Sequence, residues 1–417
     1  MPKIRIEGGQ KLTGTINVSG AKNSVVALIP AAILCDESTT ISNVPNITDV
    51  DDLENILVHL NAKFKRGNGT IEINSSDIIN KEIPQNLSKK LRASYYFMGA
   101  LLGKFNKVDI YFPGGCSIGA RPINLHLKGF EQLGAKVHEE EDHFIIEAEE
   151  LKGSNIYLDF PSVGATINIM LAAVKAKGKT IIDNAAQEPE IANIATYLNN
   201  MGAKIKGAGT STITIIGVKH LHGCFHEVIP DRIEAGTYLI IAALLGKKLK
   251  IANMIPNHIE PLIAKLKEAG VDMEVGIDNV IINKTNKYKS VNIKTLVYPG
   301  FPTDLQQIMA TFLTQCEGES LIEETIYENR FQNLLELEKM GAEFKINTNN
   351  RKATIKGKTP LTGAKVNATD LRGGASLLVA GLIANGVTII DNIAYILRGY
   401  DEIMEKLTKV GAKIEII

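Results

Sequence analysis

The sequence lacks several features that would place it in a specialised class of protein. Its 417 residues include no Trp, only four Cys, and 46 Lys+Arg against 46 Asp+Glu. A formal net charge of zero argues against a general binder of nucleic acids or acidic membranes, because such proteins need a basic face. The four Cys are widely separated and show no Cys-x-x-Cys spacing, so they indicate neither a disulfide scaffold nor a metal or redox site of that type.

Long apolar runs are also missing. Apolar stretches such as residues 238–245 are far shorter than the roughly 20 residues needed to cross a bilayer. The amino terminus carries Lys3, Arg5 and Glu7 where a signal peptide would have its apolar core. We therefore expect a cytoplasmic protein that contacts neither membrane nor nucleic acid, with two or three domains for a chain of this length.

An internal repeat is the strongest architectural signal in the chain. A tripeptide with a central Gly, followed by a charged strand-like run, recurs about every 70 residues, with one degenerate copy. The copies are Leu60-Asn61-Ala62, Leu133-Gly134-Ala135, Met201-Gly202-Ala203, Ala269-Gly270-Val271, Met340-Gly341-Ala342 and Val410-Gly411-Ala412. The repeat predicts six units of similar length.

Each unit contains the same sequence of predicted elements. Residues 191–201 have the amphipathic spacing of a helix, and Gly202 stands where a left-handed residue ends a helix. Strands are predicted at 203–206 and 212–216. The other half of the same unit is a helix of small apolar residues at 163–176, which leads into a strand at 180–184.

The distribution of apolar residues predicts an unusual layering. Residues 238–245 are apolar on every side of the predicted helix, so this helix should be buried, whereas the predicted strands alternate apolar and polar residues. The usual α/β arrangement buries continuous apolar strands instead. We therefore predict an α/β fold with helices inside and sheets outside, as two cores of three units each with the active site in the cleft between them.

Chemistry is expected where the repeat is interrupted. Residues 112–122 contain three Gly and two Pro after a predicted strand, which predicts a mobile, exposed loop. A free Cys is most often a small buried hydrophobe. For Cys116 we favour a reactive thiol, because the flanking Gly amides and Arg121 would stabilise the thiolate. Cys35, Cys224 and Cys316 are interpreted as structural.

Cations occur at the starts of predicted helices and at the unit junctions. Lys22 opens an apolar helix, where the helix dipole is already positive, and Arg92 has a similar position. A Lys at a helix end is usually only a solvated residue, but Lys with free amide N–H groups also forms an anion pocket. Taken singly, the junction arginines fit surface or salt-bridge roles, and as a set they suggest a polyanionic ligand. They are Arg232, Arg330, Arg372 and Arg398.

Three carboxylates precede apolar helices. Asp231 and Asp370 fit N-caps, which need only a short hydrogen-bond acceptor. Asp304 follows Phe301-Pro302-Thr303 in a segment that Pro302 makes rigid. We interpret Asp304 as a candidate base toward a hydroxyl group in the cleft.

These motifs together resemble a known family over the full length of the chain. The sequence is similar to the UDP-N-acetylglucosamine 1-carboxyvinyltransferases of the enolpyruvyl transferase family, whose motifs occur in the same order. The motifs are Gly20-Ala21-Lys22-Asn23, Leu91-Arg92-Ala93-Ser94, residues 113–122, Ser162-Val163-Gly164-Ala165-Thr166, Glu188-Pro189-Glu190, Pro230-Asp231-Arg232-Ile233-Glu234, Phe301-Pro302-Thr303-Asp304, Glu328-Asn329-Arg330-Phe331, Ala368-Thr369-Asp370-Leu371-Arg372 and Arg398-Gly399-Tyr400.

The resemblance implies a fold and a reaction. It implies two inside-out domains, residues 22–229 with the loop at 112–122, and residues 1–21 together with 230–417. The implied reaction transfers the enolpyruvyl group of phosphoenolpyruvate to the 3′-hydroxyl of UDP-N-acetylglucosamine (UDP-GlcNAc) and releases phosphate, the first committed step of peptidoglycan synthesis. No metal or organic cofactor is implied, and a monomer is favoured.

The resemblance also implies residue roles. Cys116 would be the general acid that protonates C3 of phosphoenolpyruvate, and Asp304 would contact the 3′-hydroxyl. The residues implied for phosphoenolpyruvate are Lys22, Asn23, Arg121 and Arg398. Those implied for UDP-GlcNAc are Arg92, Arg121, Pro122, Ile123, Asn124, Leu125, Ser162, Val163, Gly164, Asp304 and Ile326, with Asp370 and Arg372 lining the second domain's side of the cleft.

Two departures and two rival functions accompany this interpretation. Asn124 stands where the family commonly has an acid, and Gly373-Gly374 replaces at least one small non-glycine residue, which we expect to loosen a helix start. A shikimate-3-phosphate enolpyruvyl transferase would share the fold but lack the Cys loop. An inactive paralogue could bind UDP-GlcNAc without turnover.

Overall fold

The structure is a computed structural model of the 417-residue chain, and it describes residues 2–114 and 123–417. The predictions for Cys116, Arg121 and Pro122 fall outside the described residues. The described chain divides into two compact units. The amino-terminal unit comprises residues 20–114 and 123–229, and the carboxy-terminal unit comprises residues 2–19 and 230–417.

The amino-terminal unit builds its described strands into three sheets, ordered β13-β3-β5-β4, β6-β8-β7 and β11-β12-β10-β9. Its helices are α1 Lys22–Ala31, α2 Thr48–His59, α3 Gln85–Ser88, α4 Tyr96–Phe105, α5 Asn124–Gln132, α6 Val163–Ala173 and α7 Pro189–Asn200, with 3-10 helices η1 Ala32–Leu34 and η2 Arg92–Tyr95. Its strands are β3 Ser38–Ser42, β4 Lys63–Arg66, β5 Thr70–Asn74, β6 Lys107–Tyr111, β7 Lys136–Glu139, β8 His143–Glu147, β9 Asn155–Tyr157, β10 Lys179–Asp183, β11 Lys204–Lys206, β12 Thr212–Ile216 and β13 Phe225–Glu227.

The carboxy-terminal unit likewise has three sheets among its described strands, ordered β15-β16-β14-β2, β17-β18-β20-β19 and β21-β22-β1-β23. Its helices are α8 Arg232–Leu245, α9 Glu260–Glu268, α10 Thr303–Leu313, α11 Gln332–Glu338, α12 Leu371–Ile383, α13 Ala394–Leu397 and α14 Ile403–Lys409, with 3-10 helices η3 Pro256–Ile259 and η4 Thr348–Asn350. Its strands are β1 Ile4–Glu7, β2 Leu12–Asn17, β14 Gly246–Ala252, β15 Met273–Val275, β16 Asn279–Asn283, β17 Ile293–Lys294, β18 Gly318–Glu323, β19 Glu343–Asn347, β20 Lys352–Gly357, β21 Lys365–Asn367, β22 Val387–Asp391 and β23 Lys413–Ile416.

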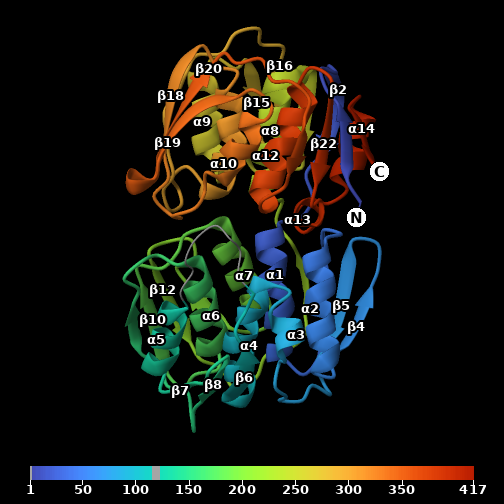
Figure 1. The fold of residues 1–417 in the computed structure, drawn as a ribbon. Coiled ribbons are helices and arrows are strands. Elements are labelled where there is room, and N and C mark those ends of the chain that lie inside the picture. Colours follow the sequence, from blue (N-terminus) through green and yellow to red (C-terminus); the bar gives the residue numbers. More distant parts are fainter. Residues whose placement is uncertain (1, 115–122) are drawn as a thin grey trace. The chain divides into compact units, whose positions relative to one another are not determined.

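The first two strands of the chain, β1 and β2, pair with strands from its second half. Strand β2 runs parallel to β14, and β1 lies between β22 and β23, antiparallel to both. Figure 1 shows the amino-terminal strands beside the strands that end the chain. These ladders place residues 4–17 within the carboxy-terminal unit.

The predicted repeat is confirmed by the backbone conformation. The central residue of all six tripeptides has positive φ, including the degenerate copy, where Asn61 has φ 68° and Gly202 has φ 99°. Asn tolerates the left-handed region better than other non-glycine residues, which explains its use in place of Gly. Each of these residues ends a helix and redirects the chain into a strand.

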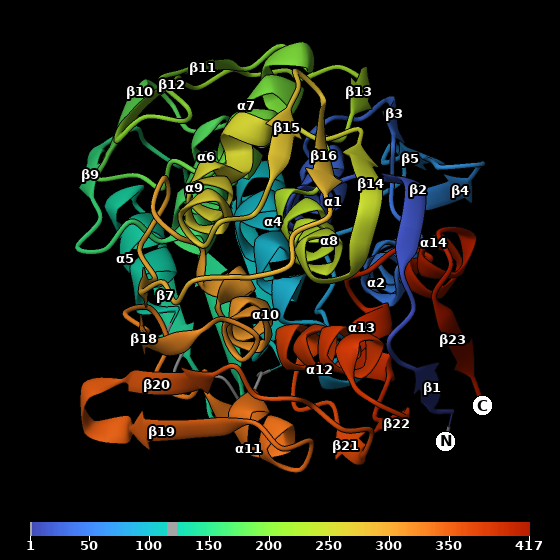
Figure 2. The same ribbon diagram turned by 90° about the horizontal axis from the view of Figure 1, so that it is seen from above.

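The most apolar helices are almost entirely buried, namely α1, α4 and α6 in one unit and α8, α10 and α12 in the other, and the sheets are only half-buried. Every residue from Ala165 to Ala173 in α6 is buried, whereas β10 alternates buried with half-buried or exposed residues. In Figure 2, β9–β12 lie at the edge of their unit with α6 inward of them. The described apolar side chains form two core clusters, one within each unit. No helix in residues 2–114 or 123–417 combines the length and apolar character required to span a membrane.

Candidate active site

Lys22 is the first residue of α1, and its charge is neutralised by a residue that the sequence analysis missed. The Lys22 Nζ atom lies 2.6 Å from Oδ2 of Asp49, which belongs to the first turn of α2. The Asp49 side chain is 1% exposed and that of Lys22 is 13% exposed. A cation at this helix start is therefore explained in part by an ion pair within the protein. Asn23, the next residue of α1, is half-buried.

Arg92 opens the 3-10 turn η2, which leads into the buried helix α4. Its guanidinium carbon lies 5.7 Å from the centroid of the Tyr95 ring, a cation–π arrangement. Residues 92–95 form this tighter turn, and the α-helix begins only at Tyr96. This turn holds the long Arg92 side chain against an aromatic face.

The segments 123–125 and 162–164 both lie at helix starts. Asn124 is the exposed first residue of α5, and Ile123 and Leu125 beside it are half-buried. Ser162 is the N-cap of α6, and its Oγ accepts a hydrogen bond from Ala165 N–H at 3.3 Å. Helix starts carry free N–H groups that favour anions, as a nucleotide site requires.

In the carboxy-terminal unit, Asp304 lies between two buried guanidinium groups. Its Oδ1 atom is 2.8 Å from Arg330 Nη2, and its Oδ2 atom is 3.3 Å from Arg372 Nη2. The arginine side chains are only 2% and 4% exposed, while that of Asp304 is 28% exposed. The Asp304 carboxylate thus forms ion pairs with two buried arginines and remains partly accessible to solvent.

Arg372 is held by further contacts. Its guanidinium carbon lies 5.4 Å from the centroid of the Tyr400 ring. Burial by itself would lower the pKa of the Arg372 guanidinium, but Tyr400 and the carboxylates of Asp304 and Asp231 raise it overall. Arg372 is therefore a permanent cation. Arg398, two residues before Tyr400, is half-buried at the end of α13.

The two predicted N-caps are confirmed. Asp370 Oδ1 accepts hydrogen bonds from the N–H groups of Arg372 and Gly373 at 3.0 and 3.1 Å. Asp231 caps α8 in the same way through the N–H groups of Ile233 and Glu234. Asp304 differs, because Pro302 occupies the N-cap position of α10 and Asp304 lies within the first turn.

Glu324 positions the segment that contains Ile326. Its carboxylate is 1% exposed and accepts hydrogen bonds from Ile326 N–H at 2.8 Å, Tyr327 N–H at 3.1 Å and Thr303 Oγ1 at 2.9 Å. Glu324 was not among the predicted site residues. The sequence did contain a signal for Glu324. In four other units the residue directly after the corresponding strand is Asn, namely Asn43, Asn184, Asn253 and Asn392, whereas this unit has Glu324 there.

The glycine pair at 373–374 lies close to neighbouring side chains. A Cβ at Gly374 would lie 2.7 Å from Cγ1 of Ile396 and 3.1 Å from Cβ of Ala368. A Cβ at Gly373 would lie 2.5 Å from Oγ1 of Thr369. Both glycines thus permit close packing around the first turn of α12, and the loosened helix start stays a prediction.

The three described cysteines behave as structural residues, as predicted. Cys35 and Cys316 are fully buried, and Cys224 is half-buried. Burial raises the pKa of all three thiols, that of Cys316 to about 12. These thiols are therefore poor nucleophiles at neutral pH.

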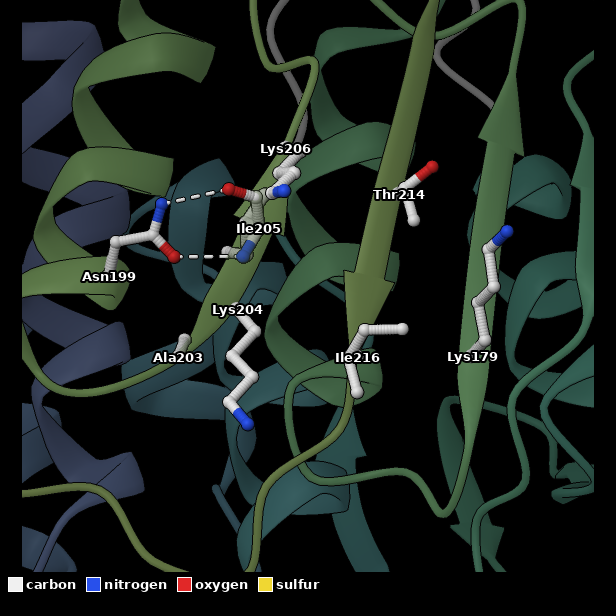
Figure 3. A pocket seen from close by; sticks show the side chains of 8 residues that line it. All are labelled: Lys179, Asn199, Ala203, Lys204, Ile205, Lys206, Thr214 and Ile216. Atoms are coloured by element: carbon white, nitrogen blue, oxygen red, sulfur yellow. Dashed lines mark hydrogen bonds between the residues drawn. The ribbon is translucent and has the colours of Figure 1, made fainter.

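A surface hollow on the sheet β11-β12-β10-β9 contains none of the predicted site residues (Figure 3). Asn199 holds the backbone of Ile205 there by two hydrogen bonds, of 2.9 and 2.8 Å. The hollow is lined by Lys179, Asn199, Ala203, Lys204, Ile205, Lys206, Thr214 and Ile216. Across residues 2–114 and 123–417, no group of three or more His, Cys, Asp and Glu side chains is placed to hold a metal ion.

The fold matches solved enolpyruvyl transferase structures. The enolpyruvyl transferase NikO from Streptomyces tendae aligns with a TM-score of 0.90 and 27% identity, over 100% of this chain and 99% of NikO. EPSP synthase from Acinetobacter baumannii aligns with a TM-score of 0.75 over 100% of both chains, at an identity of 18% that supports likeness of fold alone. The class is thus a mixed α/β enolpyruvyl transferase fold, built in the described chain from six small sheets.

The chain belongs to the EPSP synthase (3-phosphoshikimate 1-carboxyvinyltransferase) family, whose model matches residues 6–407. UDP-N-acetylglucosamine 1-carboxyvinyltransferase 2 from Listeria monocytogenes serotype 4b is 55% identical over 412 residues, which are 99% of this chain and 97% of the relative. The protein of the same name from Bacillus cereus ATCC 14579 is 52% identical over 415 residues, 99% of this chain and 96% of the relative. The resemblance inferred from the motifs is therefore confirmed.

Proposed function

We propose that this protein transfers the enolpyruvyl group of phosphoenolpyruvate to the 3′-hydroxyl of UDP-GlcNAc with release of phosphate, in peptidoglycan synthesis. One observation carries the proposal: identity of 55% to a UDP-N-acetylglucosamine 1-carboxyvinyltransferase over nearly the whole of both chains. The motifs with reactive and charged side chains fall within this aligned length. The identity to EPSP synthase from Acinetobacter baumannii is only 18%, which favours the nucleotide sugar over shikimate 3-phosphate as acceptor.

The reaction is an addition followed by an elimination. Cys116 delivers a proton to C3 of phosphoenolpyruvate, which makes C2 an electrophile of oxocarbenium character. The 3′-oxygen adds to C2 and loses its proton, and the tetrahedral intermediate then expels phosphate and a proton from C3 to restore the double bond. A positioned acid contributes about 10²- to 10⁴-fold to such a rate.

Cations supply the larger part of the expected rate enhancement. Lys22, Arg121 and Arg398 bind the phosphate and carboxylate of phosphoenolpyruvate, with Asn23 beside them. Charge that develops in the transition state is stabilised most by groups already oriented before reaction. The ion pair of Lys22 with Asp49 supports such a role, because it fixes the ammonium group at the start of α1.

Asp304 contacts the 3′-hydroxyl as a base or an orienting acceptor. Its contacts with Arg330 and Arg372 support this role, because they fix the plane of the carboxylate while the side chain stays 28% exposed. We assign Asp370 and Arg372 to the same part of the site as Asp304. The fixed position of the segment 324–327 likewise supports a contact between Ile326 and the nucleotide sugar.

The nucleotide sugar is bound mainly by the other domain. We assign this role to Arg92, residues 121–125 and residues 162–164, all in the domain 22–229. Cys116, in the segment 112–122, is assigned to phosphoenolpyruvate. Exclusion of water from the site strengthens each of these electrostatic contacts. We expect the protein to act as a monomer.

Product formation tests the proposal directly. Purified protein with phosphoenolpyruvate and UDP-GlcNAc should release phosphate and form enolpyruvyl-UDP-GlcNAc, observed by mass spectrometry. Either substrate alone should release none. Release with shikimate 3-phosphate in place of UDP-GlcNAc would support the sister activity, and binding of UDP-GlcNAc without product would support the inactive paralogue.

A further inference from the structure

One buried imidazole lies where three segments of the proposed nucleotide-sugar site meet. His126 follows Leu125 in the first turn of α5 and is 4% exposed. Its ring makes an edge contact with Tyr95, the residue that carries Arg92 on its face, with ring centroids 5.0 Å apart. Gly164 has no side chain, and a Cβ atom added to its backbone would lie only 2.9 Å from Cε1 and 3.0 Å from Nε2 of His126. The ring therefore touches the backbone of the 162–164 segment.

Hydrogen bonds determine which nitrogen of His126 carries the proton. The Gly99 N–H group donates to Oδ1 of Asn168 at 2.8 Å, which turns the amide Nδ2 group of Asn168 toward His126. That Nδ2 group donates to His126 Nδ1 at 2.8 Å. Nδ1 is thus an acceptor, and the ring proton belongs on Nε2, the nitrogen beside Gly164.

The surroundings keep this ring neutral. Burial, reinforced by the charge of Arg92, lowers the pKa of His126 to about 3. Asn168 is fully buried and comes from α6, so the pair joins the start of α5 to α6. Helices α5 and α6 also pack closely, because a Cβ at Gly129 would lie 2.3 Å from Cδ1 of Ile169. The imidazole consequently has little room to shift.

We propose that His126 is a positioning residue for nucleotide-sugar binding. Asn168 imposes the Nε2–H tautomer on its ring. In this form the ring fixes the position of the Gly164 backbone and of the Tyr95 ring, which contacts Arg92. This inference rests on the proposed function, since it explains how residues assigned there to UDP-GlcNAc are held. His126 acts through these residues and does not itself touch the substrate. Its loss should weaken sugar binding and leave the chemistry intact.

Two substitutions of His126 distinguish the contributions of its two ring nitrogens. His126→Asn keeps an acceptor near Nδ1 for Asn168 but does not reach Gly164, whereas His126→Gln reaches the Nε2 position with an N–H donor. We expect His126→Asn to raise KM for UDP-GlcNAc about tenfold, equivalent to about 1.4 kcal/mol. His126→Gln should stay within about threefold of wild type, and kcat and KM for phosphoenolpyruvate within about twofold for both variants.

The chain offers a matched control in the same unit. Asn193 and His226 form another buried pair, with Asn193 Nδ2 3.0 Å from His226 Nε2 and exposures of 6% and 5%. The His226 ring packs on Tyr197, which is not a residue of the proposed site. His226→Asn should lower the thermal unfolding midpoint without changing KM for UDP-GlcNAc.

Nitrogen-15 NMR of the imidazoles gives a second readout, with His126→Gln assigning the resonances. The expected signature is a neutral ring protonated at Nε2. An Nδ1–H or charged ring, or an unchanged sugar KM in folded His126→Asn, overturns the inference. If His126→Asn does not fold, Gly164→Ala crowds the same contact from the opposite side and must raise the sugar KM.

The outcomes for this inference and for the proposed function are distinguishable. Wild-type protein that binds UDP-GlcNAc without turnover refutes only the reaction, and the tenfold comparison is then made on Kd by calorimetry. Wild-type protein that binds no UDP-GlcNAc overturns both.

Discussion

At the scale of single residues, several buried charges in this protein are held in ion pairs. Lys22 pairs with Asp49, and Arg330 and Arg372 pair with Asp304. A buried ion pair gains little net free energy over an apolar pair, but removing one partner leaves a charge that burial strongly disfavours. Substitutions at such positions therefore change stability as well as substrate binding, and both must be measured.

For Lys22 this argument gives a prediction about folding. Lys22→Met should lower the free energy of unfolding by about 3 kcal/mol, because Asp49 remains buried without its ammonium partner. Lys22→Met combined with Asp49→Asn should recover much of that loss while phosphoenolpyruvate use stays impaired. Urea unfolding of the two variants checks the prediction, and equal stabilities for wild type and Lys22→Met would contradict it.

Reactivity of the cysteines is a second residue-scale prediction. The epoxide fosfomycin, which resembles phosphoenolpyruvate, should alkylate Cys116 alone and abolish turnover, because burial raises the pKa of the other three thiols. Peptide mass spectrometry after limited labelling identifies the site, and UDP-GlcNAc should change the rate. Comparable labelling of Cys35 or Cys224 would refute the assignment. Cys116→Ala is the matched control and should take up no label.

Arg92 gives a prediction that distinguishes the two substrates. Arg92→Ala should raise KM for UDP-GlcNAc at least tenfold, while KM for phosphoenolpyruvate changes by less than about threefold. The reason is that a desolvated guanidinium bound to an anionic group contributes more than about 1.4 kcal/mol. Steady-state kinetics with each substrate varied in turn measures this, and an unchanged sugar KM would remove Arg92 from the site.

At the scale of elements, the start of α12 is limited by packing. Gly374→Ala should destabilise the protein by about 1–3 kcal/mol, because the new methyl group meets Ile396 and Ala368. Ile396→Val in the same background should restore part of the loss by removing a methyl group. Denaturant unfolding compares the two, and a Gly374→Ala variant as stable as wild type would show that the helix start can shift.

Several elements followed directly from local sequence. The strand predicted at 212–216 is β12 Thr212–Ile216, and the helix predicted at 163–176 is α6 Val163–Ala173. Periodicity and the position of Gly202 were sufficient here, because both are local properties. The 3-10 turn at residues 92–95 was not predictable in the same way, because four residues are too few to show a periodicity.

At the scale of the whole molecule, a polar cluster ties the two ends of the chain within the carboxy-terminal unit. Lys406 Nζ donates to Glu234 Oε1 at 2.7 Å and to Ser19 Oγ at 2.6 Å, and Ser19 Oγ donates to Asp401 at 2.6 Å. The Ser19 N–H group also donates to Glu234 Oε2 at 2.7 Å. The cluster thus anchors the segment at which the chain passes from one unit to the other.

This cluster predicts a pH dependence of stability. Burial raises the pKa of Glu234 from 4.5 to about 7, although Lys406 opposes the shift. Between these values the folded protein binds more protons at this carboxyl than the unfolded chain does, so its contribution to stability decreases as pH rises. Glu234→Gln removes this titration.

Unfolding of wild type and Glu234→Gln should therefore be compared at pH 5 and pH 8. The stability advantage of the wild type should shrink between these values by an amount on the order of 3 kcal/mol. An advantage that grows with pH would mean that Lys406 outweighs burial and lowers the pKa of Glu234.

The sequence by itself determined the six repeats, the buried helices, the N-caps at Asp231 and Asp370, and the family, because these depend on local periodicity and on motifs in order. Only the tertiary structure revealed Asp49 beside Lys22, Glu324 beneath Ile326, and His126 beside Gly164. Asp49 and His126 are distant in sequence from the residues that they contact, and Glu324, two residues before Ile326, is held by Thr303 from another element. Which side chains meet across such distances depends on the packing of helices and turns, and neither spacing nor composition encodes that directly.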